Sequence, residues 1–99
     1  MLNIEKKADG TNLEVKLSGR LDTVTAPQLE GAIRESIDGV TNLSFDFTEL
    51  EYISSAGLRV LLAAQKIMNK QGDMVVKNVS AEVNEIFEVT GFTDILSIE

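Results

Sequence analysis

The chain has 99 residues and carries 9 lysines and arginines against 16 aspartates and glutamates, so we expect one domain with a formal net charge of −7. It contains no cysteine and no histidine, which excludes disulfide bonds, thiolate nucleophiles, cysteine-ligated zinc sites and every triad that needs histidine. The acidic balance argues against a nucleic-acid partner, because nucleic-acid phosphates favour a basic surface.

Two runs of alternating apolar and polar residues begin the chain and predict a β-hairpin. The period of two is typical of half-buried strands. Asp9 and Gly10 lie between the runs, where they predict a tight turn. Gly19 is expected to end the second run. The apolar residues of the two runs are Leu2, Ile4, Leu13, Val15 and Leu17.

A helix is predicted to follow the hairpin. Thr25 is a candidate N-cap, and Gln28 three residues later would complete a capping box. Gly31 in mid-helix costs about 1 kcal/mol against alanine, which hints at close packing there. Gly39 is placed to end the helix in a left-handed conformation. The apolar face consists of Leu29, Ala32, Ile33 and Ile37.

The second half of the chain alternates predicted strands and helices. Residues 43–47 predict a third strand, and a second helix begins at Ser54 or Ser55 and runs to Gln71. Residues 74–79 predict a fourth strand with an apolar start typical of an interior strand. Ser80 caps a third helix, which Gly91 ends. Ile95, Leu96 and Ile98 predict a short final strand.

This order of elements predicts a single α/β domain over residues 1–99. A hairpin followed by alternating strands and helices indicates a mixed sheet of four or five strands, with the later strands parallel. Each helix has one wide apolar stripe, so about three helices should cover the sheet.

Neither a membrane span nor a signal peptide is predicted. The longest strongly apolar stretch, residues 60–64, is too short to cross a bilayer. Charged side chains at residues 5–7 stand where a signal peptide would be apolar. We therefore expect a cytoplasmic protein with no direct membrane insertion.

The segment that joins the third strand to the second helix is the most informative for function. Ser54 and Ser55 stand at a helix start, where backbone N–H groups lack helical acceptors and the helix dipole is positive. A phosphate on either serine would lie among these donors. Ala56 and Gly57 would let another protein approach closely. The simpler interpretation is an N-cap serine, but two adjacent serines cannot both cap one helix.

Carboxylates near strand ends form a second group of candidates. Asp22 follows the second strand, and it either hydrogen-bonds its own turn or belongs to a surface beside the two serines. Asp46, Glu49 and Glu51 are clustered in the sequence but have no spacing of a known calcium loop, so no metal site is predicted. Glutamates at positions 82, 85 and 88 indicate a solvated face of the third helix.

At these residues the sequence resembles the STAS domain, in particular the stand-alone anti-sigma factor antagonists. The resemblance covers nearly the whole chain. Its specific motif is FDF at residues 45–47 with YISSAGL at 52–58. Supporting motifs are SGRLD at 18–22 followed by TAP at 25–27, and TGF at 90–92. It implies a STAS-like fold.

The resemblance also implies a partner switch. In this family the unphosphorylated antagonist binds an anti-sigma factor that is also a serine kinase with an ATP-binding fold, and this binding releases a client such as a sigma factor. The kinase then phosphorylates the antagonist with ATP and the complex separates, until a serine phosphatase restores the binding form. The antagonist itself needs no cofactor.

The motifs align family residues of known role with positions in this chain, so the resemblance implies roles for individual residues. The implied phosphoacceptor is Ser55, with Ser54 as the second choice because many members have aspartate at that position. Asp22 matches a family aspartate on the partner-facing surface. The implied partner-binding surface comprises Asp22, Thr23, Tyr52, Ser54, Ser55, Ala56, Gly57 and Arg59.

Two other function classes remain open. Related STAS domains act with anion transporters or lipid-transport machinery, so this chain could be a transporter-associated subunit or bind a small ligand or lipid. An enzyme with Ser55 as nucleophile would lack a histidine base, and the nearest basic residue in the sequence is Arg59. No catalytic residue is therefore assigned.

Overall fold

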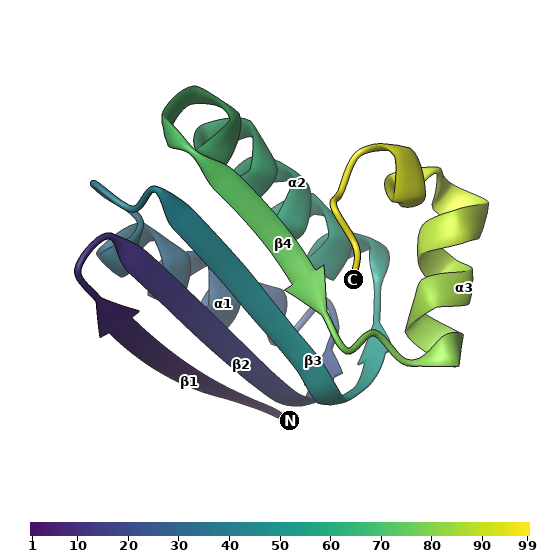
Figure 1. Cartoon of the computed structure of the whole chain (residues 1–99). Helices are drawn as coiled ribbons and strands as arrows, with labels where there is room; N and C mark the ends of the chain where they lie inside the picture. Colours follow the sequence, from purple (N-terminus) through teal and green to yellow (C-terminus); the bar gives the residue numbers. More distant parts are fainter.

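Four strands lie side by side in chain order in the computed structural model, which describes residues 1–99. Helices alternate with the later strands, and a single turn of 3-10 helix precedes the C-terminus (Figure 1). The elements are β1 Leu2–Asp9, β2 Asn12–Leu21, α1 Ala26–Ser36, β3 Asn42–Ile53, α2 Ser55–Gln71, β4 Asp73–Lys77, α3 Ala81–Thr90 and η1 Phe92–Asp94.

The pairing of the strands confirms the predicted mixed sheet. β1 and β2 are antiparallel, and Asp9 pairs with Asn12, so only two residues form the turn. Gly10 at the first of these positions has φ +62°, which glycine adopts without steric cost. β2, β3 and β4 are mutually parallel. The predicted α/β class is therefore confirmed, as is the order of strands and helices up to the third helix.

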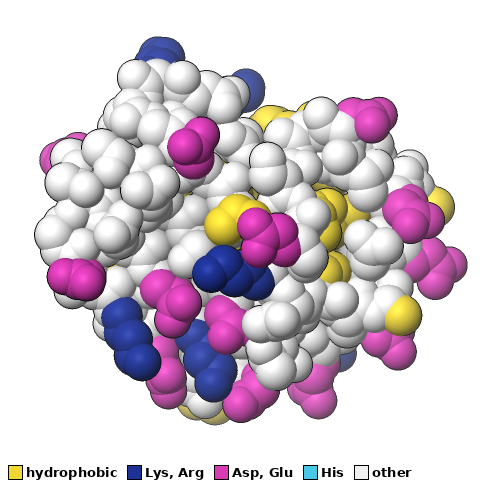
Figure 2. Space-filling view, viewed as in Figure 1, with side chains coloured by type: hydrophobic (Ala, Val, Ile, Leu, Met, Phe, Trp, Pro, Cys, Tyr) yellow, Lys and Arg dark blue, Asp and Glu magenta, His cyan; other side chains and the backbone are white.

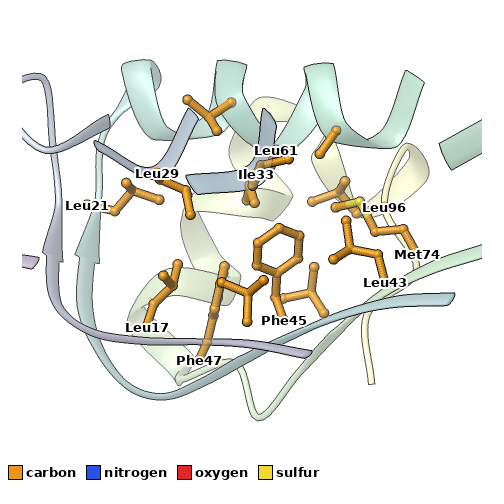
Figure 3. Packing of buried hydrophobic residues seen from close by; sticks show 14 of the residues in the cluster. Leu17, Leu21, Leu29, Ile33, Leu43, Phe45, Phe47, Leu61, Met74 and Leu96 are labelled. Carbon is orange, nitrogen blue, oxygen red and sulfur yellow. The ribbon is translucent and has the colours of Figure 1, made fainter. Parts of the chain in front are cut away.

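One face of the sheet is covered by helices. α1 and α2 lie behind the sheet in Figure 1, and α3 packs at the side of β3. Alternate side chains of the central strands point into this layer, where Leu17 and Phe45 meet Leu29 of α1 and Leu61 of α2 (Figure 3). All four of these side chains are at most 1% exposed. This single core holds the strand ends in place.

The other face of the sheet is open and polar. Figure 2 shows charged side chains of both signs across it, and acidic side chains on the side where α3 lies. Glu14, Lys16, Asp46 and Lys77 stand on strands at positions that alternate with the buried residues.

No helix of the chain is long and apolar enough to cross a membrane.

Strand β3 is longer than predicted. It continues through Leu50 to Ile53, because two extra residues are inserted opposite β2. Between the pairs Lys16–Asp46 and Ser18–Glu49, β3 advances by three residues while β2 advances by two. Such bulges change which residues point inward, so burial after Phe47 falls on every third residue. The expectation that the strand ends at residue 47 is wrong.

The C-terminal strand expected at residues 95–98 is not formed. η1 occupies Phe92–Asp94, and a single parallel bridge joins Ile98 to Val76 at the edge of β4. The sheet therefore has four strands and not five. β4 itself stops at Lys77, before the predicted end at residue 79, because Asn78 turns into a left-handed conformation with φ +58°.

Three further local expectations are wrong. Thr25 stands at the N-cap of α1 as predicted, but its side chain makes no capping hydrogen bond, so the predicted capping box with Gln28 is absent. Gly31 faces open space and not a close neighbour. Gly19 lies inside β2 with φ +96°, where a side chain would meet the backbone oxygen of Met1. Gly19 thus admits the N-terminal backbone and does not end the strand.

Candidate functional site

The candidate site lies at the edge of the sheet where β2 and β3 end. Leu21 and Ile53 are paired at these ends, and the N–H of Ser54 donates to the carbonyl of Leu21 at 2.8 Å. The chain then leaves β2 toward α1 and leaves β3 toward α2, so both helices begin at this edge. The carboxyl ends of parallel strands are the usual location of sites in α/β sheets.

The two serines have different structural roles. Ser54 is the N-cap of α2, with extended backbone, and its hydroxyl oxygen accepts from the N–H of Gly57 at 3.5 Å. Ser55 is the first helical residue and is exposed. The fold uses the hydroxyl of Ser54 for capping, and no hydrogen bond of the fold uses the hydroxyl of Ser55.

Gly57, which was predicted to belong to the partner-binding surface, is buried in the first turn of α2. A Cβ at this position would lie 2.6 Å from Cγ of Leu21 and 2.9 Å from Cγ1 of Ile53. These distances are shorter than carbon atoms tolerate, so only glycine lets the first turn of α2 rest on the ends of β2 and β3. Gly57 therefore sets the height of Ser55 above the sheet.

Hydrogen bonds to Asp22 order the loop that follows β2. One oxygen of its carboxylate, Oδ1, accepts from the backbone N–H groups of Val24 at 3.0 Å and Thr25 at 3.1 Å. The N–H of Asp22 donates back to the Thr25 hydroxyl at 2.8 Å, and that hydroxyl lies 2.9 Å from the carbonyl oxygen of Arg20. The bond from the Thr25 N–H is the main cause that lowers the pKa of Asp22, with help from Val24 and the N-terminal amine.

We expect Asp22→Ala to lower the Tm at pH 7 more than Asp22→Asn, because asparagine retains an acceptor oxygen for the two N–H groups. In the folded state the pKa of Asp22 lies below its ordinary value of 3.8, which holds in the unfolded state. Its electrostatic contribution is thus complete above that value and is lost as the pH falls through the folded-state pKa. Thermal unfolding from pH 7 to pH 3 should show wild type and Asp22→Asn converging at the acidic end.

The remaining predicted surface residues come together at the same edge. Tyr52 is 36% exposed, and the guanidinium of Arg20 lies 4.4 Å from the centre of its ring. A shallow groove of about 210 Å³ separates the first turns of α1 and α2. Thr23, Ala56 and Arg59 line it together with Pro27 of α1. Asp22, Thr23, Tyr52, Ser54, Ser55, Ala56 and Arg59 therefore surround one edge of the molecule.

Two residues of this edge are missing from the predicted surface. Arg20 stacks on Tyr52 because β2 and β3 pair them across the strands, a register that the sequence does not reveal. Val24 is 80% exposed in the loop after Asp22. A lone apolar residue between two threonines, outside any strand or helix period, is the signal that could have identified it.

Two of the three clustered carboxylates of β3, Asp46 and Glu49, have local partners. Asp46 accepts from the N–H of Thr48 at 2.9 Å and from the amide of Asn78 at 3.1 Å, and the bonds from Thr48 are the main cause that lowers the pKa of Asp46. Glu49 lies 3.5 Å from the amine of Lys16. No group of three or more acidic side chains converges on a point where a metal ion could bind.

Comparison with known proteins finds one matching family and several relatives of similar sequence. The STAS domain family matches residues 3–99. BtrV of Bordetella bronchiseptica is 38% identical over 94 residues, which cover 93% of this chain and 80% of BtrV. The anti-sigma-B factor antagonist of Listeria monocytogenes is 31% identical over 97 residues, with coverage of 95% and 84%.

A solved structure shares the whole fold. The crystal structure of an anti-sigma factor antagonist from Mycobacterium paratuberculosis superposes with a TM-score of 0.90 at 25% sequence identity. The superposition covers 99% of this chain and 85% of that one. All four strands and three helices therefore have counterparts in a solved protein.

Proposed function

The chain belongs to the STAS domain family, and we propose that it acts there as an anti-sigma factor antagonist controlled by phosphorylation of Ser55. The unphosphorylated protein binds an anti-sigma factor that is also a serine kinase, and this binding releases the client of that factor. The kinase transfers the γ-phosphate of ATP to the Ser55 hydroxyl, and the complex separates. A serine phosphatase returns the protein to the binding form.

The observation that carries this proposal is the division of roles between the two serines. Ser54 is held as the cap of α2, whereas Ser55 is exposed on the first turn with small neighbours on its C-terminal side. A kinase can thus reach the Ser55 hydroxyl without unfolding the helix start. The names of the Listeria and Mycobacterium relatives support the antagonist role.

Electrostatics explains how the phosphate would end binding while the fold persists. A phosphoserine adds about −1.5 to −2 charges at pH 7, on a chain whose formal charge is already −7. In a protein interface this charge would be desolvated without a partner, which is strongly unfavourable. Within the antagonist, the free N–H groups and the positive dipole end of α2 stabilise it.

Phosphorylation with purified variants tests the site. Incubated with the anti-sigma factor kinase of the same organism and ATP, wild type should gain one phosphate by intact-mass spectrometry, and Ser55→Ala should gain none. Ser54→Ala is the matched control, which should still be phosphorylated although loss of the cap costs about 0.5–2 kcal/mol of stability. A phosphate that persists in Ser55→Ala and maps to Ser54 would contradict the assignment.

A second experiment tests whether phosphorylation of Ser55 ends binding to the kinase. Wild type and Ser55→Ala should bind the kinase equally before ATP is added. After ATP, only Ser55→Ala should remain bound in size-exclusion chromatography. A transporter-associated role, in contrast, predicts that neither protein binds such a kinase at all.

A further inference from the structure

The feature that the proposed function does not explain is the exposure of Val24. Its side chain is 80% exposed, next to Met1 the highest value among the large apolar residues. A single exposed valine is common on protein surfaces and by itself indicates nothing. Val89 of α3, which is 79% exposed, is such a case and serves below as the reference.

Val24 differs from Val89 in its position beside the candidate site, and hydrogen bonds order the loop that carries it. Its own N–H donates to Asp22 Oδ1 at 3.0 Å, and the next N–H, of Thr25, donates to the same oxygen at 3.1 Å. Thr25 is 5% exposed, and its hydroxyl ties the loop to the backbone of β2. A β-branched side chain is also restricted about its own Cα–Cβ bond. Val24 is thus presented in a fixed direction.

Its position connects it to the candidate site. Thr23, directly before Val24, lines the groove between α1 and α2 together with Ala56 and Arg59. The loop leaves β2 at Leu21, whose carbonyl accepts from the N–H of Ser54. An apolar side chain that is ordered before binding loses little conformational entropy in an interface, so less of its contact energy is offset.

We propose that Val24 is an apolar anchor of the partner-binding surface and inserts into an apolar pocket on the anti-sigma factor. This inference rests on the proposed function. The pocket must accept a branched aliphatic side chain and lie beside the part of the partner that receives Ser55. Asp22 then acts through Val24, because its carboxylate orders the loop that presents the anchor.

Binding of the purified anti-sigma factor kinase to four proteins tests the anchor by titration calorimetry. Val24→Thr keeps the branched shape but replaces one methyl group by a hydroxyl that the pocket cannot satisfy, so the Kd should rise about tenfold. Val24→Ile should stay within about twofold of wild type, because it retains an apolar branched side chain. Val89→Thr, with the same change at the same exposure on α3, should bind like wild type.

Steady-state phosphorylation separates anchoring from a merely structural effect. Val24→Thr should raise KM about tenfold and leave kcat unchanged, since Val24 does not touch the reacting atoms. Equal affinity of wild type and Val24→Thr would overturn the anchor and leave the proposed function standing. An equal loss in Val89→Thr would also overturn it. Failure of wild type to bind the kinase would overturn the proposed function and the anchor with it.

Discussion

Phe47→Ala is expected to bring the protein close to unfolding under native conditions. The Phe47 side chain is fully buried, and its ring centre lies 6.0 Å from that of Phe45 and 6.4 Å from that of Phe87. Truncating a buried phenylalanine to alanine costs about 3–5 kcal/mol, from the lost apolar burial and the cavity left behind. Domains of this size have a total stability of only about 5–15 kcal/mol.

The loss should also loosen α3, because Phe87 belongs to that helix and packs against the lost ring. Urea unfolding followed by far-UV circular dichroism should show a midpoint shifted to much lower urea. Val89→Ala is the control on the solvent side of α3, and its free energy of unfolding should stay within about 0.5 kcal/mol of wild type. A Phe47→Ala protein as stable as this control would contradict the packing described for the core.

Gly57→Ala and Gly31→Ala are expected to change stability in opposite directions. The Cβ of Gly57→Ala would overlap the buried side chains of Leu21 and Ile53, and overpacking costs about 1–3 kcal/mol. The Cβ of Gly31→Ala would meet no atom within 4 Å. There, alanine should stabilise α1 by about 0.5–1 kcal/mol, because it restricts the unfolded chain.

Gly57→Ala and Gly31→Ala should also differ in their affinity for the kinase. In Gly57→Ala the first turn of α2 must move outward, so Ser55 changes its height above the sheet and kinase binding should weaken. Gly31→Ala should bind like wild type. Differential scanning calorimetry and titration with the kinase measure the two effects. A Gly57→Ala protein with raised Tm and unchanged affinity would show that α2 does not rest on β2 and β3 as closely as described.

The regular parts of the fold were predictable because local pattern and tertiary packing agree in them. Alternation identified β1, β2 and the first half of β3, and cap residues placed the start of α2 at Ser54 or Ser55 and that of α3 at Ser80. The second half of β3 was not predictable, since two bulges replace the alternation by burial at Leu50 and Ile53. The predicted C-terminal strand is absent because only Leu96 is buried in the core, Ile95 is exposed, and Ile98 makes a single bridge with Val76 and no ladder.

The candidate site was predictable by residue type but not by role. The double serine was visible in the sequence, but which serine caps α2 depends on the backbone direction set by the end of β3. Close packing at a helix glycine was expected at Gly31 and occurs at Gly57 instead, where two strands converge beneath the helix. The contact of Arg20 with Tyr52 depends on the register between β2 and β3, and the sequence pattern does not reveal this register.

The order of the strands in space has a consequence for how the chain can fold. Each strand pairs only with its neighbour in the sequence, in the order β1, β2, β3, β4. No strand has to be inserted between two that are already paired, so the sheet can grow by addition at one edge as the chain is synthesised from its N-terminus. Each added strand closes a loop of only one helix or one tight turn, which keeps the entropy lost at every step small.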